Sequence, residues 1–238
     1  MSNHSMSVFS ATAMLLLLVG LTTGCQNPNN APTPDGEQSA QETGAEEAAL
    51  SDAFHSERLA DWQWVRENPE GHRMTPEGLE ILIEPGGLMG GGKDAKNIYT
   101  RPLPQDANRV AVTVEHHPES QFEQAGLILY HDDDNYVKLV REFVDGATNI
   151  IFIIETEAAP ELISSWPSEQ AAERVGIQWQ GNTLQAFVIE GEENGESIIG
   201  SGEFPMDPRP RAGVFAQSGQ PDSDRWARFA GFTIQTAE

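Results

Sequence analysis

The chain has 238 residues, a formal net charge of −23 and an isoelectric point of about 4.4. A surface this acidic repels nucleic-acid phosphates and anionic lipid headgroups, so nucleic acid is not an expected partner, and membrane attachment through a basic patch is excluded. The length suffices for one sizeable domain with accessory segments.

The apolar pattern near the N-terminus predicts a signal peptide for export. Residues 13–25 read "AMLLLLVGLTTGC", an apolar run that is too short to span a bilayer well and fits the hydrophobic region of a signal peptide. The ending "LTTGC" resembles a bacterial lipobox, in which the cysteine is lipidated and becomes the mature N-terminus. It matches that pattern at Gly24 and Cys25 and departs from it at Thr22, where Leu is commonest. An ordinary secretory signal with a coincidental cysteine is the alternative.

The segment after the cysteine has a composition typical of a disordered linker. Residues 26–50 hold five acids, no base and no aromatic residue, so they offer little apolar surface to bury. We therefore expect a signal peptide over 1–24, a lipidated Cys25 with a disordered acidic tether over 25–53, and a globular domain over 54–238.

From residue 54 on, short segments with alternating apolar residues predict β-strands separated by turn residues such as Asp145-Gly146 and Gly181-Asn182. No long amphipathic helix is evident. The expected strands are 78–85, 97–103, 109–117, 124–131, 135–143, 149–156, 174–180, 183–190, 198–204, 211–217 and 228–235. This number of short strands in one domain indicates an all-β fold, an antiparallel β-sandwich or barrel.

The hairpin over residues 124–143 has a register that the apolar pattern sets. With Tyr130 opposite Tyr136, one face is wholly apolar and faces the core. The residues of that face are Ala125, Leu127, Leu129, Val137 and Leu139. The other face mixes aromatic, amide and charged groups, and it carries Gln124, Ile128, Tyr130, Tyr136, Lys138 and Glu142. Such a face suits a shallow ligand cleft, and it is equally compatible with an ordinary outer sheet face.

The same residues carry a family resemblance. "FEQAGLILYHDDDNYVKLVREFVDG" (122–146), "WQWVRENPEG" (62–71) and "RAGVFAQSG" (211–219) resemble the concanavalin A-like jelly-roll domain at the C-terminus of β-xylosidases and a related domain of unknown function. The likeness covers about residues 54–236, in family order. It implies two curved antiparallel sheets packed face to face with a concave surface. Carbohydrate binding is the usual inference for these relatives, although a fold alone does not give a function.

The acidic run over residues 132–135, "DDDN", has two interpretations. An EF-hand that began at Asp132 would need an oxygen ligand at the fifth position, Gly at the sixth and Glu at the twelfth, where this chain has Tyr136, Val137 and Phe143. Asp and Asn suit turns because their side chains bond the local backbone. We interpret the run as a hairpin turn, with a weak calcium site as the alternative, and we expect no cofactor.

The sequence assigns no catalytic residue and no metal ligand. Retaining glycosidases need two carboxyl groups about 5–5.5 Å apart, and the E-x-D-x-x-E pattern of glucanases with this fold is missing. Glu155 and Glu157 alternate without a third acid. His116 and His117 are strand neighbours that point to opposite faces, so they would not chelate together.

These observations predict a lipid-anchored, non-catalytic carbohydrate-binding β-sandwich of the bacterial cell envelope, on the periplasmic side or at the cell surface. The alternatives are a structural or protein-interaction domain without sugar binding and, less favoured, a glycoside hydrolase. The expected partners are a glycan and, through the lipid, a membrane; the oligomeric state is not set by the sequence. The candidate ligand-binding residues are Asn97, Gln124, Tyr130, Tyr136, Lys138 and Glu142.

Overall fold

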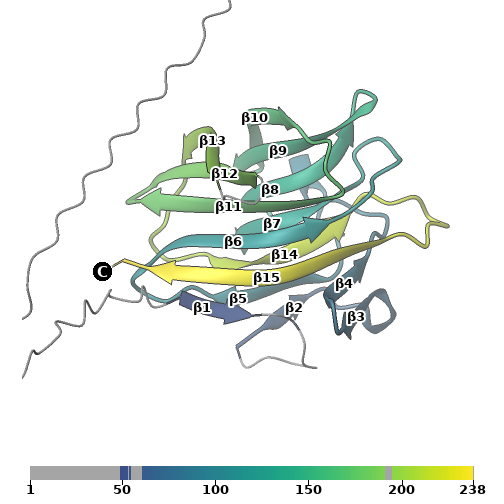
Figure 1. The fold of residues 1–238 in the computed structure, drawn as a ribbon, viewed down its shortest axis with the longest axis horizontal. Helices are drawn as coiled ribbons and strands as arrows, with labels where there is room; N and C mark the ends of the chain where they lie inside the picture. The colour runs from purple at the N-terminus through teal and green to yellow at the C-terminus, as the bar shows by residue number, and fades with distance from the viewer. Residues whose placement is uncertain (1–48, 53, 55–60, 191–194, 238) are drawn as a thin grey trace, which may run out of the picture. The chain divides into compact units, whose positions relative to one another are not determined.

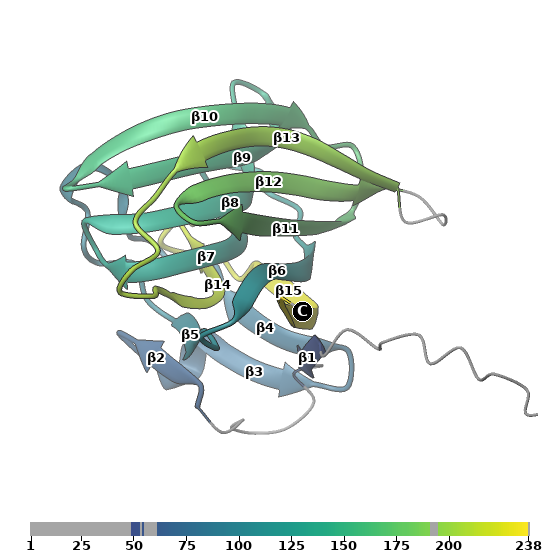
Figure 2. The ribbon, with the colours of Figure 1, turned by 90° about the vertical axis from the view of Figure 1, so that its left-hand side faces the viewer.

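The computed structural model describes residues 49–52, 54, 61–190 and 195–237 (Figure 1). The predicted signal peptide, Cys25 and most of the predicted tether lie outside these residues. In the described part of the chain, no helix is long and apolar enough to cross a membrane. The strands form two antiparallel sheets that lie face to face (Figure 2).

The first sheet has eight strands in the order β13-β12-β11-β6-β15-β4-β3, and β1 pairs with β15 beside this path. Its strands are β1 (Ala49–Asp52), β3 (His72–Thr75), β4 (Gly78–Leu82), β6 (Ala107–Glu115), β11 (Ala172–Gln180), β12 (Thr183–Glu190), β13 (Gly195–Glu203) and β15 (Trp226–Thr236).

The second sheet has seven strands in the order β10-β9-β8-β7-β14-β5-β2. Its strands are β2 (Gln63–Val65), β5 (Ile98–Pro102), β7 (Gln124–Asp132), β8 (Asn135–Val144), β9 (Ala147–Thr156), β10 (Ala159–Pro167) and β14 (Arg211–Gln217). Two short 3-10 turns complete the described elements, η1 (Pro69–Gly71) and η2 (Met89–Gly91).

The architecture confirms the predicted fold class, a two-sheet antiparallel β-sandwich of the jelly-roll type. The register predicted for the first long hairpin is also confirmed. Tyr130 lies opposite Tyr136, and Gln124 lies opposite Glu142. The five apolar residues of its predicted core face are all buried in the core between the sheets, because the alternation of a strand places every second side chain on the same face.

The sandwich begins before residue 54, the start predicted from the sequence. Strand β1, which falls in the segment expected to be tether, pairs antiparallel with β15 from Ala49–Gln235 to Asp52–Phe232. Asp52 then accepts hydrogen bonds from the Phe54 backbone N–H at 2.8 Å and from the Trp62 indole at 2.9 Å. Four residues without an alternating pattern are too short a signal to indicate a strand.

Strands β2 and β3, of three and four residues, were also not predicted. Neither was β10, at the edge of the seven-stranded sheet. Its sequence "APELISSWP" contains two prolines, and most of its residues are exposed. The pairing with β9 shifts register between Leu162 and Ser164, which is a β-bulge. At this side of the molecule β10 lies next to β13, the edge strand of the other sheet (Figure 2).

Candidate functional site

The acidic run between β7 and β8 is a turn, as predicted. Asp132 Oδ1 accepts hydrogen bonds from the Asp134 backbone N–H at 2.9 Å and from Asn135 Nδ2 at 2.8 Å, which is the local bonding that favours Asp and Asn in turns. Among the described residues, no group of three or more His, Cys, Asp or Glu side chains is arranged to hold a metal ion.

The other two aspartates of the turn bind neighbouring segments of the chain. Asp133 accepts hydrogen bonds from Arg66 Nη1 at 2.8 Å and from the Tyr130 hydroxyl at 2.7 Å. Burial, reinforced by the bond to Asp133, raises the pKa of Tyr130. Asp134 forms an ion pair with Lys93 at 2.5 Å. The turn therefore anchors the glycine-rich segment in which Lys93 lies.

That segment, residues 84–97, lies over the outer face of the seven-stranded sheet, and we call it the covering segment. Its Leu88 and Ala95 belong to a second buried apolar cluster with sheet residues such as Ile128 and Phe215. Its Gly90 N–H donates to Glu155 Oε1 at 3.3 Å. The glycines at positions 86, 87 and 90–92 are typical of a flexible loop, so the sequence did not predict that Leu88 and Ala95 fix the segment to the sheet.

The predicted shallow cleft on this face is therefore wrong, because the covering segment closes it. The six candidate ligand-binding residues have exposed fractions of 8% or less, and they are Asn97, Gln124, Tyr130, Tyr136, Lys138 and Glu142. Their role in binding a ligand remains a prediction, now for an enclosed site.

Three of the six candidates, Gln124, Lys138 and Glu142, meet in a buried polar row that also contains Gln217. In this row Gln217, Gln124 and Glu142 are cross-strand partners on β14, β7 and β8. The long side chain of Lys138 runs along the sheet to this row, where Nζ donates to Gln124 Oε1 at 2.8 Å. Gly126, between the two positions on β7, allows β8 to approach closely, because a Cβ there would lie 2.2 Å from the Leu139 carbonyl oxygen.

The charges in this row are costly to bury. Burial lowers the pKa of Lys138, although the carboxylates of Glu142 and Glu155 oppose the shift. Burial also raises the pKa of Glu142, and the Lys138 ammonium opposes it. Glu142 Oε2 and Gln217 Oε1 are buried without a hydrogen-bond partner among the described residues, each at a cost of about 1–3 kcal/mol.

The remaining candidates have structural partners. Asn97, in a left-handed conformation with φ of 53°, accepts from the Asn68 N–H at 2.7 Å and donates to Glu84 Oε2 at 3.1 Å. It thus fixes the end of the covering segment. The Tyr136 hydroxyl donates to Glu155 Oε2 at 2.5 Å, and burial together with this bond raises the pKa of Tyr136.

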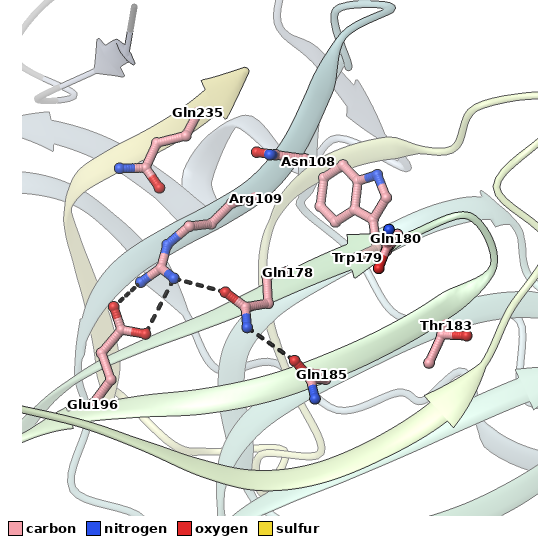
Figure 3. A pocket seen from close by; sticks show the side chains of 9 residues that line it. All are labelled: Asn108, Arg109, Gln178, Trp179, Gln180, Thr183, Gln185, Glu196 and Gln235. Carbon is pink, nitrogen blue, oxygen red and sulfur yellow. Dashed lines mark hydrogen bonds and ion pairs between the residues drawn. The ribbon is translucent and has the colours of Figure 1, made fainter. Parts of the chain in front are cut away.

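An open groove lies on the outer face of the other sheet (Figure 3). Its volume is about 710 Å³, and it is lined by Asn108, Arg109, Gln178, Trp179, Gln180, Thr183, Gln185, Glu196 and Gln235. Arg109 Nη1 donates to Gln178 Oε1 at 2.9 Å and to Glu196 Oε2 at 3.1 Å. Gln178 Nε2 in turn donates to Gln185 Oε1 at 2.9 Å.

Strand register explains how these polar groups meet. Gln235, Arg109, Gln178 and Gln185 are successive partners on β15, β6, β11 and β12. They form one row across the sheet, pointing away from the core. The Arg109 guanidinium lies 3.8 Å from the centroid of the Phe187 ring, a cation–π contact that fixes its position.

The groove was not predicted from the sequence, although the sequence carries a signal for it. Gln178 and Gln185 lie on either side of the turn at Gly181-Asn182, and a hairpin closed by that turn places them opposite each other. Chemically, the groove offers amide donors and acceptors and one guanidinium. Glu196 is the single carboxylate among its nine lining residues, so the groove does not assemble the acid pair of a glycosidase.

The sequence matches a known family over residues 90–237, and the description of that family is "Protein of unknown function (DUF1349)". The chain belongs to this family. The match includes both the covering segment's second half and all the strands that form the groove. No curated protein matches the DUF1349 chain.

Solved structures share its fold. The GH43 BlXynB protein from Bacillus licheniformis aligns with a TM-score of 0.69 and 18% identity over 79% of this chain, which spans 39% of that protein. A functionally unknown protein from Saccharomyces cerevisiae aligns with a TM-score of 0.61 and 14% identity, over 75% of this chain and 97% of that one. The carbohydrate binding module CBM66 from Bacillus subtilis gives a TM-score of 0.51 and 9% identity, over 74% of this chain and 96% of the module. At sequence identities of 9–18%, these alignments show that this chain shares the fold of these proteins.

Proposed function

We propose that the protein is a non-catalytic carbohydrate-binding module and that the groove of Figure 3 holds the glycan. The observation that carries the proposal is the row of planar polar side chains that lines an open groove on the sheet. The fold that the chain shares with a carbohydrate binding module supports it.

The chemistry of the row matches sugar hydroxyls, each of which donates and accepts a hydrogen bond. A glutamine amide offers both functions in one plane, and Arg109 adds fixed donors. Trp179 also lines the groove, although it is 8% exposed and belongs to the core between the sheets. Since each net hydrogen bond contributes about 1 kcal/mol and the groove is shallow, we expect a dissociation constant on the order of 0.1–1 mM.

A glycan array followed by isothermal titration of the purified protein tests the proposal. Gln178→Ala and Gln185→Ala should each weaken binding about fivefold, which corresponds to about 1 kcal/mol. Gln121→Ala, an exposed glutamine away from the groove, is the matched control and should bind like the wild type. Unchanged affinity in both groove variants, or no glycan bound at all, would refute the assignment.

Lipid anchoring at Cys25 is part of the same proposal and rests on the lipobox-like sequence. It would hold the module in the bacterial envelope, on the periplasmic side or at the cell surface. Metabolic labelling with a palmitate analogue should tag the protein, and Cys25→Ser should abolish the label. A label that persists in Cys25→Ser would exclude the anchor.

A further inference from the structure

The buried polar row beneath the covering segment has hydrogen-bonding capacity that the protein does not use. Lys138, Glu142 and Gln217 are 1%, 6% and 2% exposed. Glu142 Oε2 and Gln217 Oε1 have no partner among the described residues, and the Lys138 ammonium, with three hydrogens, has a described bond to Gln124. Buried polar atoms are paired in almost all native proteins, so these atoms point to a ligand.

We propose that this row is a second binding site, which takes two neighbouring hydroxyl groups of a small polyol or a terminal sugar ring, and that the covering segment opens to admit them. A hydroxyl can accept from Lys138 while it donates to Glu142 Oε2 or Gln217 Oε1.

Other classes of ligand fit the row less well. An anion would face the carboxylates of Glu142 and Glu155, both buried on this face. A cation would face the Lys138 ammonium. An apolar ligand would leave the two oxygen atoms buried and unpaired, which is unfavourable. A neutral hydroxyl ligand is the class that satisfies both signs of hydrogen-bonding group.

The covering segment has the construction of a flap. Its two ends are fixed, because the Gly86 carbonyl accepts from the Ser218 N–H at 3.1 Å and the Asn97 N–H donates to Arg66 O at 3.2 Å. Between these ends, Gly90 has a positive φ of 64°. The contact to the turn is the partly exposed Lys93–Asp134 ion pair, which water can replace at little cost.

The site lies on the outer face of the seven-stranded sheet, whereas the groove lies on the eight-stranded sheet. The inference therefore stands independently of the proposed glycan site, and variants of one site leave the other intact.

Lysine chemistry tests the flap directly, because the chain contains three lysines, Lys93, Lys96 and Lys138. Reductive methylation of the full protein, followed by peptide mass spectrometry, reports the accessibility of each. Lys93 and Lys96 should react fast and Lys138 slowly. Lys93→Gln breaks the ion pair with the turn and should accelerate Lys138 labelling about two- to fivefold, the range that corresponds to the loss of a partly exposed ion pair. Lys96→Gln is the matched control, because Lys96 pairs with Glu84 inside the covering segment, and it should not change the rate.

Ligand protection tests the binding site with methyl β-xylopyranoside, methyl α-glucopyranoside and glycerol as hydroxyl probes. At least one probe should slow Lys138 labelling threefold or more, whereas sodium acetate and tetramethylammonium chloride should not. Gln217→Met should remove this protection, and Glu142→Gln should weaken it. Gln178→Ala, in the groove, should preserve it.

Three results would overturn the inference. The first is that Lys138 reacts only at the rate of global unfolding, measured by denaturant, in both the wild type and Lys93→Gln. The second is that no hydroxyl probe protects it. The third is that acetate or tetramethylammonium protects it equally. Thermal melting confirms that each variant is folded, and Gln217→Met tests the row independently if Glu142→Gln fails to fold.

Discussion

Glu123, the residue immediately before β7, gives a specific prediction for stability. Its side chain is fully buried and accepts hydrogen bonds from Arg225 Nε at 2.7 Å and Nη2 at 2.5 Å, and from the Ser120 N–H at 3.1 Å. Burial by itself would raise the pKa of Glu123, but the bonds from His116 and Arg225 and from the Glu119 N–H together lower it to about 2.

The lowered pKa is a contribution to stability. The ordinary pKa is 4.5 and the folded value is about 2; at about 1.4 kcal/mol per pH unit, the difference corresponds to about 3 kcal/mol. Since the folded value is depressed, this stabilisation is present above pH 4.5 and is lost as the pH falls from about 4.5 to 2. His116, whose pKa burial lowers, contributes in the same direction, so a variant is needed to isolate Glu123.

Urea unfolding of the wild type and Glu123→Gln, followed by tryptophan fluorescence at pH 7, 5, 3.5 and 2.5, measures the effect. The variant should be less stable by about 3 kcal/mol at pH 7, and the difference should shrink towards zero near pH 2. Glu119→Gln, which removes an exposed partner of the same arginine, should change stability by less than about 0.5 kcal/mol. A difference that is independent of pH, or below about 1 kcal/mol at pH 7, would refute the reasoning.

Two further substitutions, with Gly87→Ala in the covering segment as a control, test the packing of the seven-stranded sheet by urea unfolding. A Cβ at Gly213 would lie 1.9 Å from the Tyr99 carbonyl oxygen, so Gly213→Ala should destabilise the protein by about 3 kcal/mol. Gly87→Ala, where a Cβ meets no atom within 4 Å, should stay within about 0.5 kcal/mol of the wild type, and equal effects in the two variants would contradict the steric argument. Tyr136→Phe leaves Glu155 Oε2 buried without its donor and should cost about 2 kcal/mol; a loss below about 0.5 kcal/mol would show that the pair contributes nothing.

The strands could be predicted because their signal is local. Alternation within 124–143 sets which residues face the core, and a slip by one residue would expose all of them. The hairpin register therefore followed from the sequence. Strands β1, β2, β3 and β10 were not predicted, because segments of three or four residues and an exposed edge strand carry no comparable pattern.

The state of the candidate site could not be predicted, because it depends on contacts between distant parts of the chain. Lys138 and Glu142 alternate with apolar residues, which is typical of a solvated face. Leu88 and Ala95, which lie 43 to 54 positions earlier in the chain, nevertheless pack over that face. Predicting the groove would have required the register of four strands, β15, β6, β11 and β12. The hairpin of β11 and β12 alone already places two of its residues, Gln178 and Gln185, opposite each other.

The edge strand β10 has a consequence for association between molecules. A sheet edge presents free N–H and C=O groups to which a strand of another molecule can add, and exposed edges seed aggregation. Pro160 and Pro167 have no N–H to donate, and the bulge after Leu162 interrupts the regular spacing that an added strand would need. An incoming strand therefore finds no continuous ladder along β10. The side chains exposed there, Leu162 among them, can thus remain at the surface without recruiting a second sheet.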